Sequence, residues 1–258
     1  MNKWVKKSIN LANSRGYLDR LFEVYPIEMG AIRGLPKGTK AKVKNVLKTK
    51  NKLHLIETLL KLSKFPIDDP YIASLRRHPH LLKKNPKTIK RIGKRLLSMG
   101  LGTILKLVAK PKSPSRQLGH SFKNWLLTKK YPFLKENEFK ETNKVAFLEG
   151  SDKKLKEFVI NELKIRSLKR RPDFILKTKN KFILGEAKFL TDYGGTQNNQ
   201  FDGALTMTKI KRDKIIGIAV LDGIAWFKSN SYMYKTLNKL NRIAISALLL
   251  EEFIKKGP

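Results

Sequence analysis

Three ionisable side chains lie within or beside two short apolar runs in the stretch RRPDFILKTKNKFILGEAKF, residues 170–189. They are Asp173, Glu186 and Lys188. Burying a carboxylate or an ammonium among Phe, Ile and Leu costs free energy unless the charged groups pair with one another or bind a ligand. The spacing therefore raises the question of which ligand would need two carboxylates and an ammonium on one sheet.

The lysine-rich turn KTKNK between the two runs predicts a hairpin that brings Asp173 level with Glu186. Glu186 and Lys188 are two residues apart, so on a strand they point to the same face. Neighbouring carboxylates repel one another unless a cation lies between them, and Mg²⁺ in particular binds one or two carboxylates together with water and phosphate. We therefore expect Asp173 and Glu186 to hold Mg²⁺. Lys188 would orient a water or neutralise charge on a phosphate during in-line attack.

This order of residues, Pro172-Asp173 followed after a spacer by Glu186-Ala187-Lys188, resembles the PD-(D/E)xK nuclease superfamily, over about residues 145–228. The resemblance implies a Mg²⁺-dependent nuclease whose in-line hydrolysis leaves a 5′-phosphate. Families of this type commonly recruit a further acid from the element before the first strand. Glu149 is our choice for that role, with a solvent-exposed position as the open alternative.

The segment FLTDYGGTQNNQF, residues 189–201, is similar to a segment found in some type II restriction endonucleases. Gly194 and Gly195 permit a tight turn, after which a helix is expected to start. Amide side chains can contact adenine edges or DNA phosphates, although Asn and Gln are also ordinary residues at a helix start. The candidate DNA contacts in this segment are Gln197, Asn198, Asn199 and Gln200.

The composition points to a polyanionic partner. The chain of 258 residues has 56 Lys and Arg against 21 Asp and Glu, which gives a net charge of +35. Nucleic acid, an anionic membrane surface or another polyanion would attract such a charge. The absence of cysteine excludes disulfides and thiolate catalysis. The longest apolar run is too short for a membrane span, and no phosphate-binding glycine loop followed by Lys-Ser or Lys-Thr is present, so we expect neither a membrane nor a nucleotide cofactor as partner.

Short helices are expected in the first part of the chain, over residues 53–62, 68–77 and 85–100. Three or four compact helices with one strongly basic member are typical of a DNA-binding module, although a structural bundle with a solvated basic face would give the same pattern. The candidate phosphate contacts are Arg76, Arg77, Lys87, Lys90, Arg91, Lys94 and Arg95.

Prolines, serines and cations in KPKSPSR, residues 110–116, mark a boundary. We therefore expect a basic helical DNA-binding and recognition domain over residues 1–110 and a PD-(D/E)xK catalytic domain over residues 111–258. Within the second domain the pattern predicts a helix over 151–163, the strand pair, a further helix, a hairpin turning at Asp222-Gly223 and a final helix over about 231–256. The fold class is α/β, with an α+β mixed sheet flanked by helices as in a restriction-endonuclease-like core.

These features together predict a Mg²⁺-dependent type II restriction enzyme that cuts double-stranded DNA at a specific sequence. Cutting both strands requires two active sites, so a homodimer is expected, with a monomer that cuts one strand at a time as the alternative. The expected location is cytoplasmic. Two alternatives remain at this point: a structure-specific repair or junction nuclease, and a non-catalytic basic nucleic-acid-binding protein.

Overall fold

The protein is described by a computed structural model that covers residues 1–26, 34–111, 114–179 and 181–257. The chain forms two compact units, a sheet unit of Met1–Ile27 with Ser113–Pro258 and a helical unit of Glu28–Lys112. The predicted boundary after residue 110 is close to the second crossing between the units. The predicted first domain is wrong at its beginning, however, because residues 1–27 belong to the sheet unit and the helical unit is an insertion.

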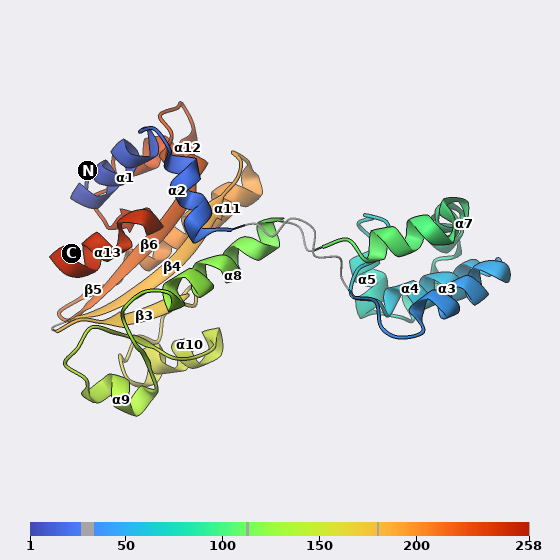
Figure 1. Ribbon diagram of the computed structural model, residues 1–258, viewed down its shortest axis with the longest axis horizontal. Helices are drawn as coiled ribbons and strands as arrows, with labels where there is room; N and C mark the ends of the chain where they lie inside the picture. The colour runs from blue at the N-terminus through green and yellow to red at the C-terminus, as the bar shows by residue number, and fades with distance from the viewer. Residues whose placement is uncertain (27–33, 112–113, 180, 258) are drawn as a thin grey trace. The chain divides into compact units, whose positions relative to one another are not determined.

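A seven-stranded mixed sheet forms the centre of the sheet unit (Figure 1). The strand order is β1-β2-β3-β4-β6-β5, and β7 also pairs with β6. The strands are β1 Phe133–Leu134, β2 Ala146–Leu148, β3 Phe174–Lys177, β4 Phe182–Leu190, β5 Lys211–Arg212, β6 Ile215–Gly223 and β7 Ala244–Ile245. This architecture confirms the expected α/β class with a mixed sheet flanked by helices.

Helices cover both faces of this sheet. They are α1 Lys3–Ala12, α2 Tyr17–Val24, α8 Pro114–Leu127, α9 Glu136–Glu141, α10 Asp152–Asn161, α11 Gly195–Met207, α12 Tyr232–Asn238 and α13 Leu250–Lys256, with 3₁₀ turns η1 Ile224–Trp226 and η2 Ala247–Leu249. Ser151 caps α10 through a hydrogen bond from the Lys154 amide, as the sequence predicts for a serine at this position.

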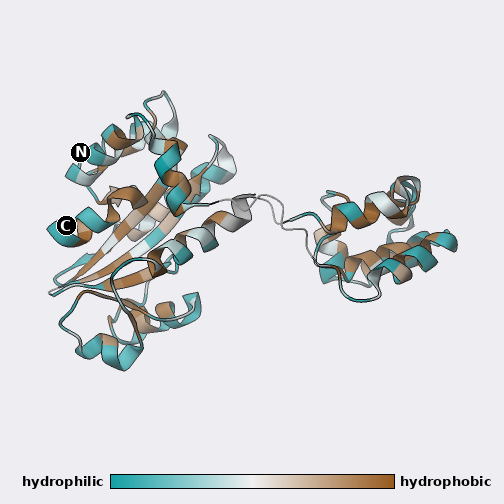
Figure 2. Ribbon diagram, in the orientation of Figure 1, coloured by the Kyte–Doolittle hydropathy of each residue, from teal (hydrophilic) through white to brown (hydrophobic). Residues whose placement is uncertain are grey.

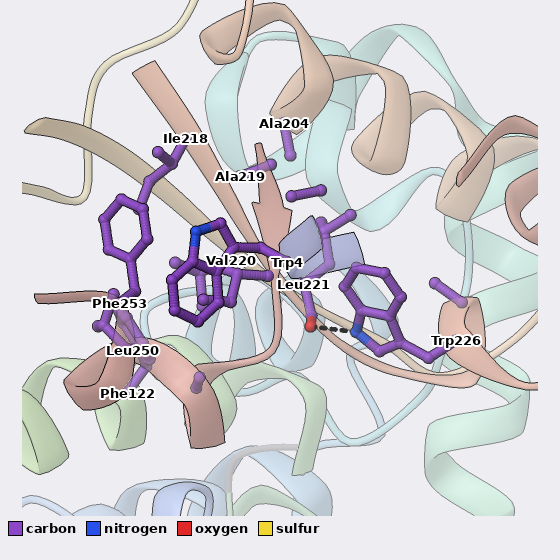
Figure 3. Close-up of a cluster of buried hydrophobic side chains, with 14 of the residues drawn as sticks. Trp4, Phe122, Ala204, Ile218, Ala219, Val220, Leu221, Trp226, Leu250 and Phe253 are labelled. Carbon is purple, nitrogen blue, oxygen red and sulfur yellow. Dashed lines mark hydrogen bonds between the residues drawn. The ribbon is translucent and has the colours of Figure 1, made fainter. Parts of the chain in front are cut away.

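The two faces are distinguished by the pairing of β4 with β6. These strands run parallel, and Glu186 lies opposite Ala219, so their side chains are on the same face of the sheet. Gly217, two residues before Ala219, is on that face too. Helix α11 packs there, and the Met207 carbonyl lies so close to Gly217 that no Cβ would fit. On the opposite face Ile218 belongs to a cluster with Trp4 and Phe253 (Figure 3).

That cluster explains why the first residues of the chain belong to the sheet unit. Trp4 is 1% exposed, and its ring meets Phe253 edge to face at 5.3 Å. The Asn2 amide donates to the Leu240 carbonyl at 2.8 Å, which joins the start of α1 to the C-terminal part of the chain. Trp226 of η1 donates from Nε1 to the carbonyl of Leu221 on β6 at 2.5 Å. Burial of two tryptophans and a phenylalanine is worth several kcal/mol, on the order of 2–3 each.

The helical unit contains α3 Thr39–Lys48, α4 Lys52–Leu60, α5 Ile72–Arg77, α6 Leu81–Lys84 and α7 Pro86–Val108. Buried residues from α4 and α7, including Leu55, Leu59 and Leu96, form its core. The expected helix over 53–62 is confirmed, and the expected helix over 68–77 begins later. The helix that was predicted to end at Gly100 kinks there instead, where φ is 70°, and continues to Val108.

Two elements predicted near the end of the chain are wrong. Asp222-Gly223 is the end of one long strand rather than a hairpin turn, because Gly223, at φ of 87°, passes close to the Leu190 carbonyl and leads into η1. The expected helix over 231–256 is divided into α12, β7, η2 and α13. Its apolar stripe is shared between them, since β7 pairs with β6 and is buried.

Hydropathy follows this arrangement, with the strands mainly hydrophobic and the outward helix faces hydrophilic (Figure 2). Within the part of the chain that the structure describes, no helix is long and apolar enough to cross a membrane.

Candidate active site

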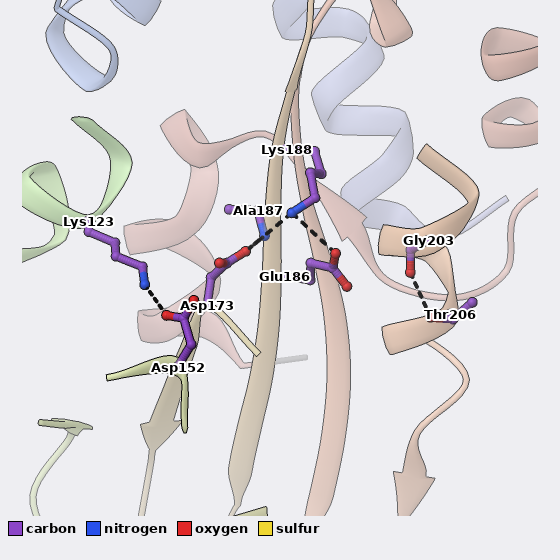
Figure 4. Close-up of polar contacts among 8 residues, drawn as sticks. All are labelled: Lys123, Asp152, Asp173, Glu186, Ala187, Lys188, Gly203 and Thr206. Carbon is purple, nitrogen blue, oxygen red and sulfur yellow. Dashed lines mark hydrogen bonds and ion pairs between the residues drawn. The ribbon is translucent and has the colours of Figure 1, made fainter. Parts of the chain in front are cut away.

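Asp173, Glu186 and Lys188 lie together on the sheet (Figure 4). Lys188 Nζ is 3.2 Å from Glu186 Oε1 and 3.7 Å from Asp173 Oδ2, so one ammonium reaches both carboxylates. Glu186 and Lys188 are on β4, and Asp173 directly precedes β3, its antiparallel neighbour. The structure therefore brings together the three residues selected from the sequence.

The position of Asp173 is fixed by the backbone of β4. Its amide donates to the Gly185 carbonyl at 2.8 Å, and its Oδ2 accepts a hydrogen bond from the Ala187 amide at 2.8 Å. The ring of Phe174 lies directly against Gly185, where any side chain would clash. Gly185 thus allows β3 and β4 to approach beside the two carboxylates.

Glu186 is the most buried member of the group. Its side chain is 3% exposed, against 24% for Asp173 and 27% for Lys188. Burial raises the pKa of Glu186, while Lys188 and, more weakly, Arg170 lower it and Asp173 raises it. Its Oε2 atom is buried and accepts no hydrogen bond among the described residues. An unpartnered acceptor on a buried carboxylate is costly, which distinguishes this position from an ordinary core residue.

The pair of carboxylates fits a magnesium ion. Within residues 1–26, 34–111, 114–179 and 181–257, no three Asp, Glu, His or Cys side chains are grouped to hold a metal. Mg²⁺ does not require three, because it is commonly held by one or two carboxylates with water and substrate phosphate at the other positions. The Asp173 and Glu186 carboxylates are hard oxygen ligands of the type that could hold such an ion.

A cavity of about 170 Å³ opens beside Asp173 and Lys188. Phe122 and Phe189 contribute aromatic walls, and Gln200 reaches it from α11. Tyr25 also lines it, and the Tyr25 ring meets Phe189 edge to face at 4.8 Å. Tyr25 therefore brings the N-terminal segment to the candidate site, which its sequence gave no reason to expect.

Tyr25 is held by a second buried carboxylate, Asp222 on β6. Asp222 Oδ2 accepts from Tyr25 at 2.7 Å and from the Ala247 amide at 3.2 Å, and Oδ1 accepts from Ser246 at 2.6 Å and from Tyr17 at 3.3 Å. Burial raises the pKa of Asp222 to about 7, although these hydrogen bonds lower it. The network joins the N-terminal segment to the sheet, close to the wall of the cavity.

An ion pair between Lys123 and Asp152 links α8 to the first turn of α10 near the site (Figure 4). The hydrogen bond from Lys123 lowers the pKa of Asp152, so this carboxylate is ionised at neutral pH. Because α8 also supplies Phe122 to the cavity wall, the ion pair helps to hold that wall in place.

The other predicted residues of the sheet unit are distributed differently. Glu149 is exposed and lines a separate cleft between α9 and α10, so it does not join the cavity of Asp173 and Lys188. The four amides Gln197, Asn198, Asn199 and Gln200 lie in α11, as expected of a helix after Gly194-Gly195. Gln200 faces the cavity, whereas Gln197 Oε1 is buried and accepts no hydrogen bond among the described residues.

The predicted cations of the helical unit are exposed, but two of them have partners. Arg91 Nη1 is 2.6 Å from Asp69 Oδ2, and Arg76 donates to the Leu60 and Leu62 carbonyls at 3.1 and 3.0 Å. Those two arginines therefore stabilise the unit itself. The remaining candidates of this set are Arg77, Lys87, Lys90, Lys94 and Arg95, all exposed.

Comparison with known proteins finds a family match. A family model described as Tsp45I type II restriction enzyme matches residues 2–256. No curated protein and no solved structure matches the chain.

Proposed function

The chain belongs to the Tsp45I type II restriction enzyme family, and from this premise we propose that it is a Mg²⁺-dependent nuclease of the PD-(D/E)xK type with its active site at Asp173, Glu186 and Lys188. As a type II restriction enzyme it is a site-specific deoxyribonuclease whose substrate is double-stranded DNA. The alternatives of a repair nuclease and of a non-catalytic basic protein are therefore not retained. The proposal adds the metal, the residues, 5′-phosphate products and a cytoplasmic location.

The three residues have two roles in the proposal. The carboxylates of Asp173 and Glu186 would hold the ion, which when bound would polarise the scissile phosphate and lower the pKa of a bound water. The Lys188 ammonium donates hydrogen bonds to the attacking water or to the phosphate oxygens, where negative charge increases during in-line attack. The buried position of Glu186 strengthens these interactions, since charges interact more strongly away from bulk water.

One observation carries this proposal. A single ammonium lies within 4 Å of two carboxylates, while one oxygen of the more buried carboxylate accepts no hydrogen bond from the described residues. An ion pair serving only stability would be expected to satisfy its buried acceptors. A set of groups left incompletely satisfied is instead what a metal and a phosphate could complete.

Plasmid cleavage tests the proposal. Purified protein is incubated with plasmid in Mg²⁺ and in EDTA, and the ends of the fragments are sequenced and ligated. We expect discrete fragments in Mg²⁺, no cleavage in EDTA, and ends that ligate without kinase treatment, because they carry 5′-phosphates. Cleavage that persists in EDTA would remove the metal from the mechanism.

A matched pair of lysine variants tests the residue assignment. Lys188→Ala is expected to reduce cleavage by about 10²–10⁴-fold or more while DNA binding in EDTA is preserved. Lys179→Ala removes an exposed lysine from the turn of the same hairpin and is expected to cut like the wild type. Full cleavage by Lys188→Ala would refute the assignment.

We further propose that the helical unit grips DNA and helps to read its sequence. In the sheet unit, the proposed DNA contacts near the cut are Gln197, Asn198, Asn199 and Gln200 of α11. The exposed cations of α7 and the net charge of +35 support this role.

Double-strand cleavage requires two active sites, so the proposed assembly is a homodimer. Analytical ultracentrifugation with and without DNA measures it, and a species of one chain throughout would contradict it.

A further inference from the structure

A second cavity in the sheet unit is strongly basic. It has a volume of about 250 Å³ and lies between the segment that leads into β3, the end of α11, and β5. Five cations line it, namely Lys169, Arg170, Lys209, Lys211 and Arg212. We call it the basic pocket. Among the described residues, no Asp or Glu side chain lines it.

The charges of the basic pocket are not neutralised by neighbouring acids. None of its five cations belongs to an ion pair within the described part of the chain. Five like charges in one small cavity repel one another, and an anion bound among them would relieve that repulsion. The pocket is therefore suited to an anionic ligand.

Two arginines of the basic pocket contact the backbone around them. Arg212 Nη1 donates to the Lys164 carbonyl at 3.2 Å. Arg170 packs against α11 at Gly203, where an added Cβ would lie 2.7 Å from Arg170 Nη2. Guanidinium groups held in this way lose less conformational entropy on binding and can form paired hydrogen bonds to phosphate oxygens.

The wall of the basic pocket also contains apolar side chains, those of Ile165, Leu168, Met207 and Ile210. A free inorganic anion has no apolar part to place there, whereas a nucleotide backbone carries a deoxyribose next to each phosphate. The combination of cations with apolar surface therefore favours a sugar-phosphate over a small isolated anion.

The basic pocket is close to the candidate active site. Arg170 is three residues before Asp173 and lies against α11, on the sheet face that carries Glu186. A DNA strand whose scissile phosphate lies beside Lys188 could therefore continue from the active site to this pocket.

We propose that the basic pocket binds a phosphodiester of the DNA other than the one that is cut, and so fixes the register of the strand at the active site. This inference rests on the DNA substrate of the proposed function. Phosphate contacts made by fixed cations position a protein on the duplex without reading its sequence.

The test uses two variants that lose the same charge. Lys209→Ala with Lys211→Ala removes two exposed lysines from the basic pocket. The control, Lys6→Ala with Lys255→Ala, removes two exposed lysines from α1 and α13, which pack on the opposite sheet face. Equal thermal unfolding of both proteins shows that they are folded. Lys211→Ala alone is the second pocket variant if the double variant does not fold.

The probes are duplexes that contain the mapped cleavage site, each with one neutral methylphosphonate in place of a phosphodiester. Binding is measured in EDTA, so that the strands stay intact. We expect a methylphosphonate at one position away from the scissile bond to weaken DNA binding about tenfold, for the wild type and for the control. The pocket variant should bind unmodified DNA about tenfold more weakly and show no further loss at that position.

A pocket variant that keeps the same penalty as the control at every position would overturn the proposal. So would a pocket variant that binds DNA normally but has lost binding of inorganic phosphate, since that result would identify a small-anion site. Binding in EDTA does not depend on cleavage. Failure of the nuclease assignment is therefore seen separately, in the plasmid assay with Mg²⁺.

Discussion

Two buried carboxylates on neighbouring strands, Glu186 on β4 and Asp222 on β6, have opposite surroundings. Asp222 is fully buried, and both of its oxygens accept hydrogen bonds from Tyr17, Tyr25, Ser246 and the Ala247 amide. Glu186 has one oxygen facing Lys188 and one with no hydrogen-bond donor among the described residues. A carboxylate with every acceptor satisfied holds the fold together, whereas one left open is available for a ligand.

The largest effect that this comparison predicts is on cleavage by Glu186→Gln. The amide keeps the shape but loses the charge that we propose binds the metal, so we expect cleavage to fall by about 10³-fold or more. The free energy of unfolding should change by less than about 1 kcal/mol, because a poorly compensated buried charge is removed as well. Plasmid cleavage in Mg²⁺ and chemical denaturation measure the two quantities. A variant with a much lower free energy of unfolding but wild-type cleavage would reverse the comparison.

The opposite pattern is expected for Asp222→Asn. Four donors point at the carboxylate, so an amide NH₂ at one of its two oxygen positions would face donors and leave them unpaired. We expect the free energy of unfolding to fall by about 2–3 kcal/mol. Cleavage, measured below the unfolding transition, should stay within about tenfold of the wild type. A loss of cleavage as large as that of Glu186→Gln would show that the Asp222 network takes part in the chemistry.

A smaller effect is expected on the pH dependence of stability. Because the pKa of Asp222 is raised to about 7, the folded protein keeps a proton that the unfolded chain releases near its usual pKa of about 4. The stability from this proton is present below about pH 4 and is lost as the pH rises to about 7. The stability difference between wild type and Asp222→Asn should therefore decrease over that range. A difference that stays constant or grows would show that Asp222 is ionised when folded.

The smallest effects are expected in the helical unit, where a cation that has an acidic partner can be compared with one that has none. Arg91 is paired with Asp69, whereas Arg95 on the same helix forms no ion pair within the described residues. We expect Arg95→Ala to weaken DNA binding severalfold and to lower the salt slope by about one. Arg91→Ala should change the slope less and lower the stability of the unit. Fluorescence anisotropy over a salt series measures both, and equal slopes for the two variants would contradict this distinction.

Much of the proposed catalytic group could be recognised from local sequence. Pro172-Asp173 and Glu186-Ala187-Lys188 are separated by a single turn, and antiparallel pairing across a short turn follows from the chain itself. The period of two along β4 then puts Glu186 and Lys188 on one face. Short-range geometry was sufficient here, because every partner lies within one hairpin.

What the sequence could not supply are the contacts between distant segments. Asp222-Gly223 has the composition of a tight turn, but pairing with β4 and β7 keeps it at the end of a strand, where Asp222 meets Tyr17 and Tyr25. Likewise, nothing local indicates that the N-terminal segment belongs to the sheet unit or that its Tyr25 lines the cavity.

The sequence by itself determined the chemistry available to this protein: two carboxylates and an ammonium at hairpin spacing, within a strongly basic chain. Only the tertiary structure decided which carboxylate keeps an open oxygen and which is enclosed by donors. That decision depends on side chains far apart in the chain, and their meeting is governed by burial of the whole core rather than by local propensity.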